Sequence, residues 1–147
     1  MSNKIVKKSL TSCAIFVSLF LAFVSATFAH HGDAGRYEDD ATVLMGTVVT
    51  LQFINPHSKL IVDVLDENNE AVRWHAEFSN PGRMNSEFGW TRDILKPGDK
   101  VTLTGRVRKG GAPLMNLTEK AQVVMTETGK QIYQTENFVP ANTAVAP

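Results

Sequence analysis

Four histidines are the side chains of this sequence best suited to bind a metal: His30, His31, His57 and His75. Histidine is the commonest protein metal ligand, because a neutral imidazole nitrogen binds zinc, copper, iron or nickel. Cleavage of an exported precursor after Ala29 would make His30 the first residue, so that its free α-amine and imidazole nitrogen could chelate one metal. The other three histidines could supply a further nitrogen. A nitrogen-rich, near-planar set favours Cu(II), which heads the divalent affinity order.

Each histidine also has an interpretation without a metal. His57 lies in an Asn-Pro-His-Ser turn, where it would bond the backbone. His75 lies between two charged residues and would be a surface residue or a member of an ion pair. The pair at 30–31 would reflect only what signal peptidase tolerates, and cleavage after Ala26 would remove the amine chelate.

Residues 1–29 have the pattern of a cleaved secretory signal. Lysines at 4, 7 and 8 precede an apolar run at 13–24, and small residues follow at 25–29. The run is about a dozen residues long, whereas a helix that spans a bilayer needs about 20. An uncleaved membrane anchor is the alternative. We therefore expect a periplasmic or secreted protein that is not inserted in the membrane after signal cleavage.

The composition of the expected mature chain restricts its chemistry and its partners. Removing 29 of the 147 residues leaves 118, the size of one domain. Cys13 is the only cysteine and leaves with the signal, so the mature chain has no disulfide and no thiol chemistry. Loss of three lysines leaves 12 basic residues against 15 acidic ones. Nucleic acid and anionic membranes need a basic surface, so neither is expected as a partner; an envelope protein is the candidate.

Alternation of apolar and polar residues predicts a mainly β domain from 42 to 128. We expect strands at 42–53, 59–65 and 72–78, a fourth from Val101 to Val107, and a fifth at 114–126 that is broken near 118–120. The predicted core face of the first strand consists of Val43, Met45, Val49, Leu51 and Phe53. Gly46 within that strand indicates a bend or bulge, as closure of a barrel requires.

Between the third and fourth strands the sequence predicts a short helix. Asn80 is a good N-cap, Pro81 suits the first helical position, and Gly89 is a natural left-handed stop. The Lys96–Asp99 segment has Pro and Gly at the central positions of a type II turn. A helix between strands three and four is a feature of the OB barrel. We predict a small five-stranded OB-like barrel with one short helix; a small β-sandwich is the alternative.

The sequence also predicts the character of the segments on either side of the β domain and the roles of its tryptophans and methionines. Residues 30–41 have no apolar period and are predicted to form a flexible lead-in, and the tail at 129–147 is predicted to be partly disordered. Trp74 is expected in the core and Trp90 as a lid on the barrel end. Core packing, not Cu(I) binding, is the expected role of the methionines at 45, 84, 115 and 125.

The remaining charge clusters and sequence motifs do not point to a specific function. The basic residues Arg106, Arg108 and Lys109, with Arg73, could accept an anion, but a solvated edge strand with protective charges predicts the same pattern. The sequence has no G-x-S-x-G elbow, H-E-x-x-H helix, P-loop or C-x-x-C motif. It therefore names no catalytic residue, and it leaves open whether the chain is an enzyme.

Several short motifs occur together in a familiar order: AHH at 29–31, NPH at 55–57, Trp74, GWTR at 89–92 and LKPGD at 95–99. In these motifs the chain resembles a family of small secreted bacterial proteins classed as a domain of unknown function. The resemblance runs from about His30 to Thr126. It implies a bacterial exported protein and no particular activity. The Glu87–Phe88 pair stands where the resemblance would lead us to expect smaller or basic residues.

From these observations we expect an exported, non-catalytic binding or accessory module, with copper or another transition metal at the histidines as its candidate ligand. One alternative is an envelope protein–protein interaction module without a small ligand. The other is a copper-dependent redox enzyme with an N-terminal histidine site, which would need an open coordination position.

Overall fold

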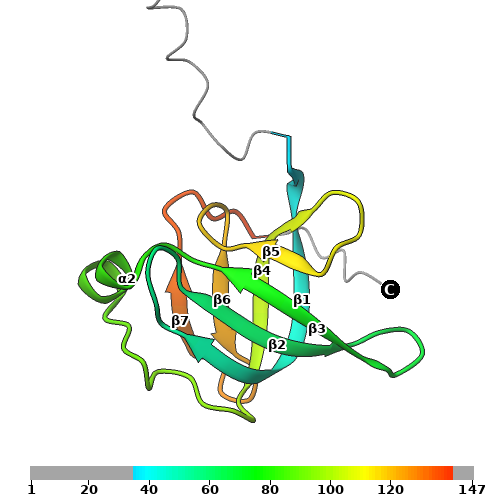
Figure 1. Ribbon diagram of the computed structural model, residues 1–147, viewed down its shortest axis with the longest axis horizontal. Helices are drawn as coiled ribbons and strands as arrows, with labels where there is room; N and C mark the ends of the chain where they lie inside the picture. Colours follow the sequence, from blue (N-terminus) through cyan, green and yellow to red (C-terminus); the bar gives the residue numbers. More distant parts are fainter. Residues whose placement is uncertain (1–34, 141–147) are drawn as a thin grey trace, which may run out of the picture. The chain divides into compact units, whose positions relative to one another are not determined.

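The computed structural model describes residues 35–140. Its strands are β1 (Tyr37–Gln52), β2 (Lys59–Leu65), β3 (Ala71–Glu77), β4 (Lys100–Arg108), β5 (Leu114–Asn116), β6 (Gln122–Met125) and β7 (Gln131–Gln134). The helix α2 (Pro81–Phe88) follows β3 (Figure 1). Among these residues, no helix is long and apolar enough to cross a membrane.

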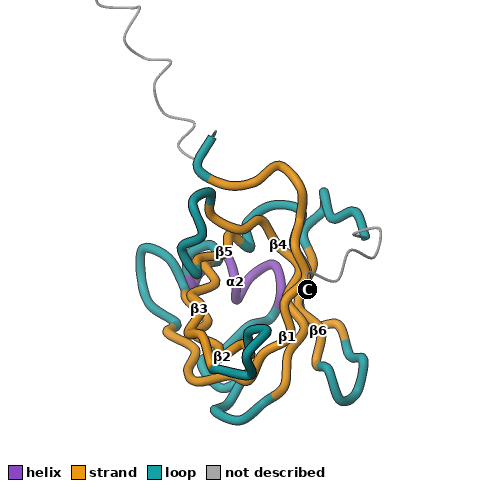
Figure 2. Tube along the Cα trace, turned by 90° about the vertical axis from the view of Figure 1, so that its right-hand side faces the viewer, coloured by secondary structure: helices purple, strands orange, loops and turns teal. Residues whose placement is uncertain are grey.

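Five strands close into a barrel in the order β1-β2-β3-β5-β4, and β4 returns to β1 (Figure 2). The β3–β5 contact is parallel, whereas β1–β2, β2–β3, β4–β5 and β1–β4 are antiparallel. β6 pairs with β4, and β7 pairs with β6, outside the closed ring. The prediction of a mainly β, five-stranded OB-like barrel with a helix after the third strand is confirmed.

The core face of β1 changes sides at a bulge between Val48 and Thr50. Before the bulge, Leu44 and Val48 contact the core, and after it Leu51 does. Met45, which we predicted on the core face, is 61% exposed. That prediction was wrong because the bulge inserts one residue and so shifts the alternation of inward and outward side chains.

The helix follows its local sequence signals. The side chain of Asn80 accepts a hydrogen bond from the backbone N–H of Arg83 at 3.0 Å, and Pro81 occupies the first turn. Gly89 ends the helix with φ of 68°, the left-handed conformation that glycine adopts without strain. The predicted bounds of this element are therefore confirmed.

The turn at 96–99 attaches the start of β4 to β1. Gly98 has φ of 94°, as the third position of a type II turn requires. Its N–H donates to the carbonyl of Val48 at 2.8 Å, and the Val48 N–H donates to the carbonyl of Asp99 at 2.8 Å. These two bonds fix the turn beside the β1 bulge.

Aromatic rings fill the end of the core beside α2. Trp90 is fully buried, with its ring centroid 4.8 Å from that of Phe78 and 5.8 Å from that of Tyr133. Its indole N–H donates to the carbonyl of Ile132 at 2.8 Å. Trp90 is thus part of the core and not a lid over it. Trp74 is partly buried and packs against the same core, as do the methionines at 84, 115 and 125.

Both flanks of the predicted domain contain more structure than their sequences indicate. β1 begins at Tyr37, so residues 37–41 extend a strand that we predicted from Thr42. The segment after Gly129 contains β7, which we did not predict. The predicted fifth strand is two separate strands, β5 and β6, which pair with different parts of β4. Long-range pairing, which leaves little trace in a local period, stabilises these segments.

Candidate functional site

His57 lies between β1 and β2, with its imidazole against the end of β3. Its Nδ1 is 2.8 Å from Oε1 of Glu77, and half of its side chain is exposed. In a neutral imidazole this contact makes Nδ1 the donor and leaves the lone pair on Nε2. Among residues 35–140, His57 has no second hydrogen-bond partner. Lys59 lies 4.0 Å from the other oxygen of Glu77 and so helps to orient this carboxylate.

His75 is on the same face of β3 as Glu77, two residues earlier. It pairs with Ile61 of β2, next to the Lys59–Glu77 pair. Of the two described histidines, His57 contacts Glu77, and His75 shares only the strand face of that residue. In the range 35–140, no three His, Cys, Asp or Glu side chains gather as a metal site. His30 and His31 lie outside the described residues.

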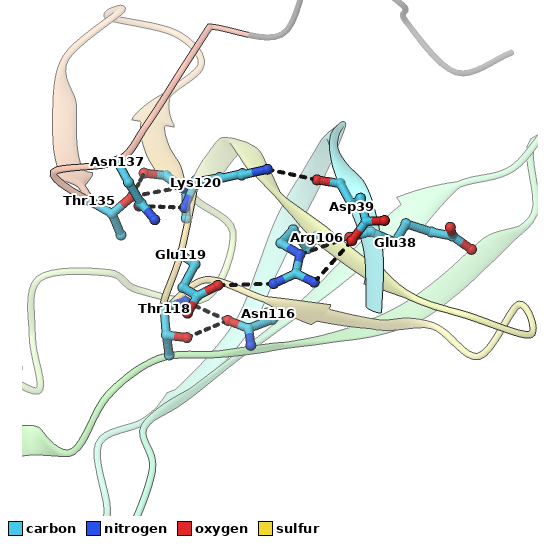
Figure 3. A network of polar contacts seen from close by, with 10 residues as sticks. Glu38, Asp39, Arg106, Asn116, Thr118, Glu119, Lys120, Thr135 and Asn137 are labelled. Atoms are coloured by element: carbon cyan, nitrogen blue, oxygen red, sulfur yellow. Dashed lines mark hydrogen bonds and ion pairs between the residues drawn. The ribbon is translucent and has the colours of Figure 1, made fainter. Parts of the chain in front are cut away.

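Of the four basic residues that we considered as an anion site, Arg106 and Arg73 are engaged by oxygen atoms. The Arg106 side chain is 11% exposed. Its Nε donates to the carbonyl of Glu38 at 2.8 Å and its Nη1 to Glu119 at 3.0 Å, with Asp39 3.9 Å from Nη2 (Figure 3). Lys120 donates to the carbonyl of Asp39 in the same network. Arg106 thereby ties the start of β1 to the segment between β5 and β6, which is a structural role.

Arg73, the other residue of that set on the barrel wall, forms a two-bond ion pair with Asp63 at 2.9 and 3.0 Å. The hydrogen bond from Arg73 lowers the pKa of Asp63, and the same bond raises the pKa of Arg73. Arg108 and Lys109 are exposed at the end of β4. The structure thus pairs Arg73 and Arg106 with carboxylates and leaves Arg108 and Lys109 exposed.

A groove of about 500 Å³ lies between α2, β7 and the segment after β5. Its lining consists of Ser79, Arg83, Glu87, Phe88, Thr118, Tyr133, Thr135, Glu136 and Asn137. We did not identify this groove from the sequence, because four of its nine lining residues come from the tail at 129–147, in which we predicted no strand. The only local signal was the isolated apolar pair Ile132–Tyr133, which is too short to establish a period.

Tyr133 forms the inner wall of this groove and predicts an alkaline limit of stability. Its hydroxyl donates to the carbonyl of Leu117 at 2.6 Å, and burial raises its pKa from 10.0 to about 12. The unfolded chain loses this proton first, so the stabilisation is complete below pH 10.0 and is lost as the pH rises to about 12. Urea unfolding across this range should show the decline, and Tyr133→Phe should lack it. An equal decline in both proteins would contradict the assignment.

Comparison with known proteins identifies a family and no characterised relative. A family model described as "Family of unknown function (DUF6152)" matches residues 19–114, well over half of the chain. A search of curated proteins gave no match. A search of solved structures also gave none. The chain therefore belongs to the DUF6152 family, whose function is unknown.

Proposed function

We propose that this chain is an exported, non-catalytic binding or accessory protein that holds a late transition metal, with copper as the candidate, at its histidines. The observation that supports this proposal is the contact between His57 Nδ1 and Glu77 at 2.8 Å. Metal-binding histidines commonly donate their second ring nitrogen to a carboxylate, which fixes the tautomer and the ring orientation. The bond to Glu77 orients the imidazole of His57 as in such metal sites, and half of the His57 side chain is exposed to solvent.

A single imidazole does not make a tight site, so further nitrogens must come from elsewhere. His75 lies on the same face of β3 as Glu77, and the segment at 30–36 precedes the described strands. An extended chain covers about 3.3–3.6 Å per residue, so seven residues can reach roughly 25 Å from Tyr37. The N-terminal amine and imidazole of His30 would complete a nitrogen-rich set if cleavage follows Ala29. Such a set favours Cu(II).

Isothermal titration of the processed protein with Cu(II) tests both parts of the proposal. One additional N-terminal residue should weaken binding, because it displaces the α-amine from His30. His57→Ala should also weaken it, and Glu77→Gln should cost about 10–100-fold in affinity, as loss of an orienting carboxylate does elsewhere. Arg83→Gln is the control, because Arg83 pairs with Glu87 and not with Glu77. Equal, weak binding by the processed and extended proteins would eliminate the amine chelate, and unchanged binding by His57→Ala would eliminate the folded-domain ligand.

A second candidate function, an envelope protein–protein interaction module, is supported by a different surface. Met45 and Leu65 are 61% and 64% exposed, and both line an open hollow of about 360 Å³ on the barrel wall. Exposed apolar side chains that gather in one place can mark an interaction site. Capture of an envelope protein by the chain, and its loss in a Met45→Gln, Leu65→Gln variant, would support this function. Retention of the captured protein by that variant would contradict it.

A further inference from the structure

The groove between α2 and β7 is a ligand-sized hollow whose lining contains neither His57, His75 nor Glu77. Its volume of about 500 Å³ falls within the range of small-molecule sites, roughly 300–1,000 Å³. Figure 1 shows α2 and β7 side by side at one end of the barrel, and both contribute to its lining. The metal proposal makes no use of this groove.

The walls of the groove are fixed by bonds within the protein. Tyr133 is held by its hydroxyl bond to Leu117 and by an edge-on contact with Phe78, whose ring centroid is 5.1 Å away. The buried hydroxyl of Thr135 accepts from the N–H of Ala121 at 2.9 Å. A site whose walls are already ordered loses little conformational entropy when a ligand binds.

The rim of the groove offers both donors and acceptors. Arg83 uses its Nε for both oxygens of Glu87, at 3.0 and 2.9 Å, so no terminal guanidinium nitrogen is needed for this pair. The amide oxygen of Asn137 accepts from the N–H of Lys120 at 2.8 Å, which turns its NH₂ group away from that bond. Glu136 and the hydroxyl of Ser79 have no hydrogen-bond partner within residues 35–140.

The charges of the lining argue against an anionic ligand. Arg83 and Glu87 neutralise each other, and Glu136 leaves one uncompensated carboxylate. An inorganic anion would meet two carboxylates for one guanidinium. Hydroxyl groups are donors and acceptors at once, so they suit a rim that carries both kinds of group. The half-buried ring of Phe88, 4.6 Å from Tyr133, adds an apolar surface beside that rim.

We propose that this groove binds a neutral, hydroxyl-rich ring of the saccharide class. The C–H face of such a ring packs on Phe88, and its hydroxyls bond to Arg83, Glu87 and Asn137. The ligand thus buries an apolar face against an aromatic side chain while its polar edge meets fixed hydrogen-bonding groups. This proposal is independent of metal binding, and either can fail without the other.

Two-dimensional NMR of the full processed chain, titrated with maltose, cellobiose and N,N′-diacetylchitobiose, tests the groove directly. We expect saturable amide shifts in α2 and at 133–137 with at least one of these sugars, at millimolar concentration. Arg83→Gln and Asn137→Ala should each weaken that binding by about fivefold or more, as loss of one or two hydrogen bonds does. Phe88→Leu, which keeps apolar volume but removes the aromatic face, should also weaken it.

Arg73→Gln is the matched control, because Arg73 also pairs with a carboxylate and has a similar exposed fraction, 56% against 58% for Arg83. It should leave sugar binding unchanged. The proposal is overturned if none of the three sugars shifts the groove residues, or if the Arg73 variant loses as much affinity as the Arg83 variant. A titration with spermidine tests a cationic ligand. If spermidine shifts the groove residues and none of the sugars does, the proposal is also overturned.

Discussion

Replacement of Trp90 by alanine is expected to lower the free energy of unfolding by about 4 kcal/mol, because truncation of a buried tryptophan leaves a large cavity. Trp90 is fully buried between Phe78 and Tyr133. The substitution also removes the indole donor to the Ile132 carbonyl, which joins the loop after α2 to β7. Small domains have about 5–15 kcal/mol of stability in total, so this one change would remove a large share of it.

Urea unfolding followed by far-ultraviolet circular dichroism measures the effect without relying on tryptophan fluorescence. Trp90→Phe separates the two contributions, since it keeps an aromatic ring but removes the donor, and it should cost less than the alanine change. Trp74→Ala is the comparison, because this second tryptophan is only partly buried. If Trp74→Ala proved as destabilising as Trp90→Ala, the aromatic cluster would not be the principal support of the core beside α2.

Gly105→Ala is expected to destabilise the barrel by about 3 kcal/mol, at the upper end of what overpacking usually costs. A Cβ at this position would lie 2.6 Å from Cδ2 of Leu117 and 2.7 Å from the carbonyl oxygen of Asn116. The Asn116 contact is with backbone of β5, which cannot move without disturbing its pairing with β4. Thermal or urea unfolding of the variant gives the measurement.

Gly82→Ala is the control for this substitution. Gly82 is exposed in α2, and its added Cβ would approach only the Asn80 side chain, at 3.2 Å. Alanine is favoured over glycine inside a helix by about 1 kcal/mol, but the capping oxygen of Asn80 must shift slightly to admit the methyl group, so this variant should stay close to the parent in stability. Equal stability of the two alanine variants would show that β5 can shift to accommodate a methyl group at 105.

Local signals in the sequence were enough to predict the helix and the succession of the first four strands along the chain. Asn80, Pro81 and Gly89 each act on the backbone of their own neighbourhood, so their meaning does not depend on distant residues. Met45 shows where a local period fails. One extra residue at the β1 bulge reverses the faces, and no residue type at that position marks where the reversal begins.

The candidate sites depend on contacts that the sequence does not reveal. The partners of Arg106 are the Glu38 carbonyl and Glu119, which come from segments far apart in the chain. The local sequence shows only that Arg106 alternates with Arg108, a pattern that also fits a solvated edge strand. The carboxylate beside His57 comes from the far end of β3. The groove required β7, which is held by its pairing with β6 and by the hydrogen bond from Trp90 to Ile132.

The parallel contact between β3 and β5 has a consequence for how the folding unit is delimited. The family match ends at Leu114, the first residue of β5, whereas the ring closes through Met115 and Asn116. A truncated polypeptide that stops at the end of the match would leave the neighbouring edges of β3 and β4 unpaired. Unprotected edges of this kind recruit strands from other molecules and promote aggregation. The closed ring therefore extends through Asn116 and its buried core through Tyr133, beyond the boundary that sequence similarity alone would suggest.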